Sequence, residues 1–169
     1  MNKKNLINNH QNVKPHVVLL GAGASRAVCQ KGHYYGKKVP VMNDLVHVLG
    51  LAKILKGAGV HITDNFESIY SEIQNTRLRC KIEEKVYKYF NSLLLPMKVT
   101  DYDRLLLSLR QKDAVFTFNW DLFLFDAWVR NLHVAKLPEI FFLHGNARIG
   151  FCMDHLCWGR LGASCRKCN

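Results

Sequence analysis

Three short apolar runs, each followed at once by small polar residues, restrict the fold of this chain more than any other feature. The runs are Val17–Leu20, Ala114–Phe118 and Ile140–Leu143. Short runs rich in Val, Ile and Phe are typical of buried strands, and the stretches between these runs space their apolar residues as helices do. Because strands that alternate with helices favour parallel pairing, the sequence predicts an α/β fold with crossover connections.

The helical segments are marked by apolar spacing and by residues that begin or end helices. Asn43 is placed to cap a helix, and Pro96 to end one. In chain order we expect a short helix from about Ser25, a helix from Asn43 to Gly57, two helices between Asp64 and Leu95, one capped by Thr100 or Asp101, and one over 122–132.

The polar residues that follow the three runs are expected to meet. They are Gly21–Ser25, Asn119–Asp121 and His144–Asn146. In a parallel sheet the carboxyl ends of the strands lie along one edge, where α/β proteins bind their ligands. The sequence therefore predicts one crevice lined by all three clusters.

The glycine-rich cluster has what a phosphate group needs. Gly21 and Gly23 allow close backbone approach, a helix start offers free N–H groups, and Ser25 adds a hydroxyl. Arg26 occupies the third glycine position of the dinucleotide-binding pattern, so the full motif is not met. An ordinary strand-to-helix turn therefore remains an alternative.

The other two clusters supply candidate catalytic groups. His144 follows an apolar strand and precedes a glycine, which places it to exchange protons in a cleft; a histidine buried in the core is the alternative. Asn119 and Asp121 follow the second strand. Spacing alone favours a helix-capping role for them, because an Asp before Leu122 is an expected helix start.

A cysteine cluster near residue 160 predicts a metal site. Cys152, Cys157, Cys165 and Cys168 can form a tetrahedral, structural zinc site, and the last pair has the spacing of a zinc knuckle. His155 is an alternative ligand to Cys157, and unliganded thiols are the alternative to zinc. The remaining cysteines, Cys29 and Cys80, stand apart.

The charge of +11, from 24 Lys and Arg against 13 Asp and Glu, lies mainly in the first third. Residues 1–60 hold nine basic residues against Asp44 alone, which suits a polyanion such as a pyrophosphate or a nucleic acid. No run reaches the roughly 20 apolar residues of a membrane span, and the polar N-terminus lacks the apolar core of a signal peptide. We therefore expect a cytoplasmic protein with no membrane partner, whose cysteines bind metal or stay reduced.

Taken in order, these motifs resemble the sirtuin-like family of NAD-consuming proteins, in the divergent prokaryotic branch that includes antiphage NADases. The matching segments are Val17–Ser25, Val39-Pro40, Phe116–Asp121, Leu143–Gly145 and the cysteine cluster. The resemblance implies a Rossmann-like parallel sheet with a helical insertion over about 60–112 and a small zinc-binding module. It divides the chain into a polar leader (1–15), an NAD-binding domain (16–150) and a zinc-binding segment (151–169).

The resemblance also implies roles for the polar clusters. Gly21, Ala22, Gly23 and Ser25 would hold the pyrophosphate and ribose of NAD. Asn119 would hold the nicotinamide ribose and a water, Asp121 the nicotinamide carboxamide, and His144 would act as the general base. The shared reaction is cleavage of the bond between nicotinamide and ribose.

Two departures from the family pattern affect the expected activity. Val39–Asn43 lacks the Asp-Phe and Arg of deacylating sirtuins, and Phe118–Asp121 replaces their Gln-Asn-Ile-Asp, so we expect an NAD hydrolase, with a protein deacylase as the alternative. The chain ends at Asn169, where the family returns to the sheet. The resemblance thus implies an incomplete sheet in a fragment of a longer product, which a second copy or an effector domain would extend. An inactive fragment and a zinc-containing nucleic-acid-binding module are the alternatives.

Overall fold

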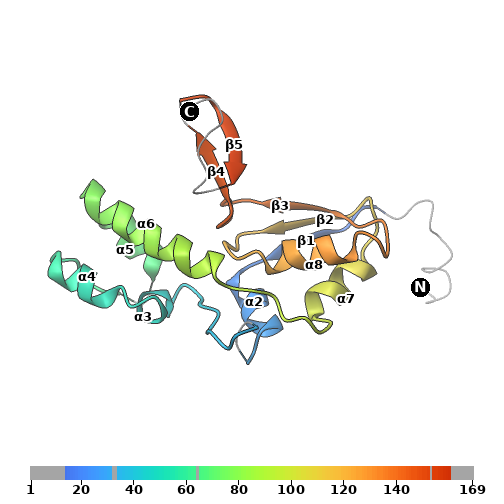
Figure 1. The fold of residues 1–169 in the computed structure, drawn as a ribbon, viewed down its shortest axis with the longest axis horizontal. Helices are drawn as coiled ribbons and strands as arrows, with labels where there is room; N and C mark the ends of the chain where they lie inside the picture. The colour runs from blue at the N-terminus through green and yellow to red at the C-terminus, as the bar shows by residue number, and fades with distance from the viewer. Residues whose placement is uncertain (1–13, 32–33, 64, 153, 161–169) are drawn as a thin grey trace.

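The computed structural model describes residues 14–31, 34–63, 65–152 and 154–160 (Figure 1). Its centre is a three-stranded parallel sheet of β1 (Val17–Leu20), β2 (Ala114–Thr117) and β3 (Glu139–Phe142), in the order β1-β2-β3. The strands pair in register, so that Leu19, Phe116 and Phe141 lie side by side. The predicted α/β fold with parallel strands is confirmed.

Helices make both crossovers between the parallel strands. Among the described residues, the long crossover from β1 to β2 contains six helices, and the short one from β2 to β3 contains α8. Figure 1 shows α2, α7 and α8 beside the sheet and α3–α6 beyond its strand ends. No described helix is long and apolar enough to cross a bilayer. The helices are α2 (Ala22–Val28), α3 (Leu45–Val48), α4 (Ala52–Gly57), α5 (Phe66–Glu72), α6 (Thr76–Asn91), α7 (Asp101–Ser108) and α8 (Phe123–Asn131).

Two of the helix predictions were wrong. The first helix begins at Ala22 with Gly21 as its N-cap, so Ser25 lies buried inside α2. The helix expected from Asn43 to Gly57 is two short helices, because Gly50 has φ +63°, a left-handed conformation that ends α3. The break places Leu49 and Leu51, on either side of it, in the core.

The remaining helices form where the sequence predicted them, and side chains cap three of them. Asn65 accepts a hydrogen bond from the Glu67 N–H at the start of α5, and Asn75 accepts one from the Leu78 N–H at the start of α6. Thr100 forms a capping box with Asp103 at the start of α7. These caps satisfy backbone donors that have no partner within a helix.

The two faces of the sheet differ in burial. Val115 and Thr117 point into the core on the side of the helices, whereas Val17 and Leu19 on the other side are 63% and 65% exposed. Parallel sheets are usually covered on both faces. Within the described residues the outer face is therefore an uncovered apolar surface.

An antiparallel hairpin, which the sequence did not predict, follows the sheet. It consists of β4 (Ile149–Cys152) and β5 (Cys157–Arg160), and Figure 1 shows it projecting away from the sheet. The hairpin places Cys152 opposite Cys157.

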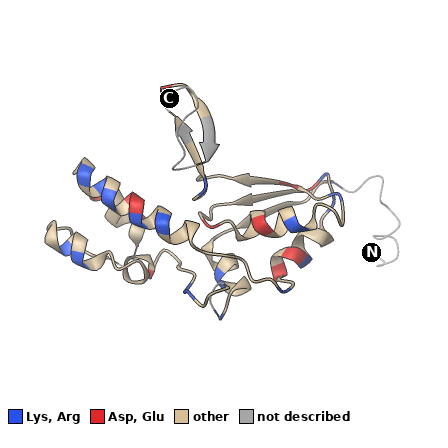
Figure 2. Cartoon of the chain, viewed as in Figure 1, with Lys and Arg blue, Asp and Glu red and all other residues tan. Residues whose placement is uncertain are grey.

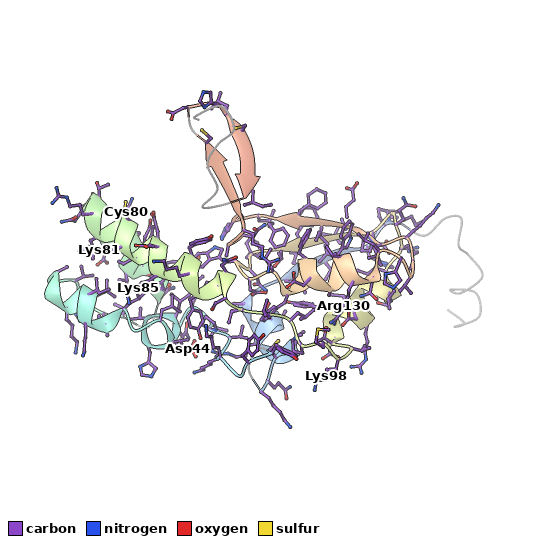
Figure 3. The ribbon with its side chains drawn as sticks, in the orientation of Figure 1. Asp44, Cys80, Lys81, Lys85, Lys98 and Arg130 are labelled. Carbon is purple, nitrogen blue, oxygen red and sulfur yellow. The ribbon has the colours of Figure 1, made fainter. Side chains whose placement is uncertain are left out.

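An ion pair with hydrogen bonds joins α7 to α8. The Asp103 carboxylate, 3% exposed, accepts hydrogen bonds from Arg130, from Asn131 and from Thr100. These donors outweigh the effect of burial and hold the pKa of Asp103 well below its usual range. Arg130 also donates to the Lys98 carbonyl, next to the start of α7 (Figure 3). The pair therefore fixes α7 against α8.

We predict that Arg130→Gln lowers the free energy of unfolding by about 2–3 kcal/mol, because it leaves the buried Asp103 charge without its main partner. Urea unfolding measures the change. Arg104→Gln is the matched control: it breaks an exposed pair with Asp101 on the same helix and should cost less than about 0.5 kcal/mol. Equal losses in the two variants would contradict the prediction.

Candidate functional site at the carboxyl ends of the strands

Three of the predicted site residues meet in one buried hydrogen-bonded cluster. The Ser25 hydroxyl donates to Asp121 Oδ1 at 2.9 Å, and Asn119 Nδ2 donates to Ser25 Oγ at 2.9 Å. Each of the three residues is at most 5% exposed. Because α2 begins at the end of β1 and Asn119 and Asp121 follow β2, adjacent parallel strands bring these residues together.

Tyr102 on α7 completes the cluster, and the sequence reasoning missed it. Its hydroxyl lies 2.8 Å from Ser25 Oγ and 3.3 Å from Asn119 Nδ2. Since the single Ser25 proton goes to Asp121, Tyr102 donates to Ser25 and accepts from Asn119. Burial and the nearby Asp121 carboxylate raise the pKa of Tyr102, which keeps the phenol neutral. A signal was present in the sequence: Tyr102 lies one helical turn before Leu106 on the buried face of α7.

Asp121 serves both the cluster and the helix that follows. Its Oδ1 accepts the Ser25 proton and also the Phe123 N–H at 3.2 Å, at the start of α8. The helix-capping alternative and the site assignment are therefore both compatible with its geometry. Burial raises the pKa of Asp121 to about 6, because a charged carboxylate is poorly solvated there.

Asn119 is incompletely hydrogen-bonded. Its Nδ2 donates to Ser25 and Tyr102, whereas its buried Oδ1 has no partner among the described residues. A buried acceptor without a donor is costly and marks a place where a water or a ligand can donate. Asn119 lines a hollow of about 20 Å³ with Ala22 and Pro40, which has room for about one water.

His144 lies at the rim of this region. It follows β3, is exposed, and its ring meets that of Phe118 edge to face, with centroids 5.2 Å apart. Phe118 precedes Asn119 and lines the same hollow. The structure thus places the predicted base beside the cluster with no direct hydrogen bond to its four described members.

The glycines of the first cluster face open space. Apart from its chain neighbours and, for Gly23, the backbone of α2, a Cβ added to Gly21 or Gly23 would meet no atom within 4 Å. Packing in this structure therefore does not require glycine there, and a ligand could approach the backbone at both positions. Ala22, between them, forms part of the hollow.

Part of the N-terminal positive charge is already neutralised. Arg26 and Lys38 both pair with Asp44, at 2.5 and 2.7 Å. Hydrogen bonds from these two residues lower the pKa of Asp44 to about 2 despite its partial burial. Arg26 also donates to the Val39 carbonyl, so one hydrogen bond joins α2 to the segment that lines the hollow at Pro40.

The zinc prediction falls largely outside the described residues. Cys152 Sγ lies 3.7 Å from His155 Nδ1, and Cys152 opposes Cys157 in the hairpin. Cys165 and Cys168 lie outside the described residues, as does most of the predicted leader over 1–15. No group of three or more candidate ligands occurs in the part of the chain that the structure describes. Zinc binding stays a prediction.

No protein-family model matches the sequence, and no curated protein matches it significantly.

We predict that Asp121 makes the protein less stable as the pH rises from about 4 to 7. Its pKa is about 6 when folded and near 3.9 when unfolded, so over this range the folded state binds the proton more tightly. Protonated Asp121 contributes up to about 3 kcal/mol to the free energy of unfolding. This contribution is complete below about pH 4 and is lost as the pH rises through 6.

Urea unfolding of wild type and Asp121→Asn from pH 4 to 8 measures this effect. The Asn oxygen can still accept from Ser25 and Phe123, so the variant removes the titration with little change in shape. Other carboxylates with a lowered pKa, such as Asp44, are present in both proteins. Their effects therefore cancel when the two free energies of unfolding are subtracted. A difference in stability that does not vary with pH would contradict the prediction.

Proposed function

We propose that this chain is the NAD-binding part of a sirtuin-like NAD glycohydrolase, which uses water to cleave the bond between nicotinamide and ribose. The observation that carries the proposal is the buried cluster of Ser25, Tyr102, Asn119 and Asp121, with an unpartnered Asn119 oxygen, at the carboxyl ends of parallel strands. This edge is where α/β proteins bind nucleotides.

The chemistry of the residues fits NAD. Gly21 and Gly23 leave their backbones open to a pyrophosphate, and the Asn119 oxygen can accept from a ribose hydroxyl or a water. Asp121 supplies a buried acceptor on the other side of Ser25, suited to an amide N–H such as that of a carboxamide. A hollow of about 20 Å³ is much smaller than a dinucleotide, so we expect the segment with Pro40, which lines it, to move when NAD binds.

Hydrolysis requires three contributions from the protein. Departure of nicotinamide leaves positive character on the ribose, which the Asp121 carboxylate stabilises through a medium of low polarity. Asn119 positions the attacking water. As the water oxygen bonds to the ribose carbon, the electron pair of the broken bond leaves with nicotinamide, and His144 accepts the proton of the water.

The supporting contacts hold these groups in place. Tyr102 and Ser25 use their hydroxyls to orient Asn119 and Asp121, and the pair of Asp103 with Arg130 fixes the helix that carries Tyr102. Because the hydroxyls are buried and fully bonded, we assign them a positioning role and no proton transfer to substrate.

We predict that the protein releases nicotinamide from NAD and that His144→Ala and Asn119→Ala each lower the rate at least about 100-fold, because they remove the base and the group that positions the water. Chromatographic separation of nicotinamide and ADP-ribose measures the rate. His133→Ala is the matched control, an exposed histidine after α8, and should keep the wild-type rate.

Three outcomes would contradict the proposal. The first is no nicotinamide release by the wild-type protein, and the second is release that His144→Ala leaves unchanged. The third is release only with an acetyl-lysine peptide, which would assign a deacylase instead.

A further inference from the structure

A second pocket lies beside the polar cluster, between α5, α6 and Trp120. Its volume is about 320 Å³, within the range of small-molecule sites. Most of its wall is apolar, and Glu67, Ser71, Glu83 and the Tyr70 hydroxyl supply its polar groups. The lining residues are Phe66, Glu67, Tyr70, Ser71, Ile82, Glu83, Val86 and Trp120.

Packed aromatic rings hold the pocket open. Phe66 and Ile82 are 3% and 0% exposed, so they belong to the core. The Trp120 ring packs edge to face with the rings of Phe66 and Phe90, whose centroids lie 6.2 and 5.7 Å from its own. Since these rings are fixed by core packing, a ligand would meet a preformed apolar wall.

The charge of the pocket is opposite to that of its surroundings. Among the described residues, its charged lining residues are the two carboxylates, Glu67 and Glu83, with no Lys or Arg. The chain as a whole carries +11, and α6 itself is rich in basic residues (Figures 2 and 3). The basic residues of α6 are Arg77, Arg79, Lys81, Lys85 and Lys88.

Neighbouring contacts show that the acidic and aromatic groups suit a cation. The Tyr70 hydroxyl donates to Glu83, so this exposed hydrogen bond joins two lining residues of the pocket. The Arg79 guanidinium lies 5.0 Å from the centroid of the Tyr70 ring, so this aromatic wall already attracts one positive group. Arg79 is not among the lining residues.

We propose that this pocket binds a small organic cation, an amine or guanidine carried on an aromatic or aliphatic body. The apolar body would displace water from the half-buried side chains of Tyr70, Val86 and Trp120, and the cation would pair with Glu67 and Glu83. A carboxylic acid of the same shape would be repelled by the same two groups. This assignment does not depend on the NAD activity.

An occupant of this pocket would lie close to the polar cluster. Trp120 forms a wall of both the pocket and the small hollow, and it stands between Asn119 and Asp121 in the chain. Its carbonyl also accepts the Ala147 N–H, beyond the turn that carries His144. The side chain of Trp120 is therefore a direct reporter of binding.

Binding of two probes of similar shape tests the proposal. We expect naphthylethylamine to bind at least 10-fold more tightly than naphthaleneacetate by calorimetry, and to shift the indole N–H signal of Trp120 in a proton–nitrogen NMR spectrum. Trp120→Phe assigns that signal. Ser71→Phe should abolish binding of the amine by filling the rim of the pocket.

Paired charge variants separate the pocket from the general charge of α6. The double variant Glu67→Gln with Glu83→Gln should reduce the preference for the amine to less than about 3-fold. Glu84→Gln is the matched control, because Glu84 neighbours Glu83 but pairs with Lys88 and does not line the pocket. Equal binding of both probes, no binding of the amine, or a preference that survives the double variant would each overturn the proposal.

Discussion

The hydroxyl of Ser25 is the interaction on which the arrangement of the site depends. It joins the helix after β1 to the residues after β2 and to Tyr102 on α7, and it uses its one proton and both lone pairs. Because all of these groups are buried, losing the hydroxyl would leave several polar atoms without partners. The geometry of Asn119 and Asp121 is therefore a property of three segments together. The pair of Asp103 with Arg130 extends this dependence to α8, since it fixes the helix that presents Tyr102.

Trp120 links the sheet to helices α5 and α6. It follows the sheet in sequence, yet its ring packs against Phe66 of α5 and Phe90 of α6. Its polar neighbours, Asn119 and Asp121, turn instead toward Ser25. One tripeptide thus faces an apolar pocket on one side and a polar cluster on the other. This division gives the two proposed ligands, a dinucleotide and an organic cation, separate places that share one wall.

The net charge of this protein does not describe any one of its surfaces, because its charged residues are paired or grouped locally. Arg26 and Lys38 are held by Asp44, so the basic N-terminal third does not form one uninterrupted cationic patch. Glu67 and Glu83 line a mainly apolar pocket, although Glu83 belongs to the mainly basic helix α6. The net charge of +11 therefore favoured a polyanion as partner, whereas the pairing of individual groups determines where each kind of ligand can bind.

The sequence by itself determined the sheet and most of the helices, because apolar runs and capping residues act over a few neighbouring positions. It placed Ser25, Asn119 and Asp121 at the strand ends, since parallel strands must share that edge. It did not reveal the break at Gly50, because the surrounding leucines keep helical spacing through it. Tyr102 could be expected in the core but not in the cluster, since its hydroxyl partners lie far away in the chain. The tertiary structure alone decided which polar groups satisfy one another, that the Asn119 oxygen has no partner among the described residues, and that two glutamates from different helices line one mainly apolar pocket. These facts depend on distances between segments that no local pattern specifies.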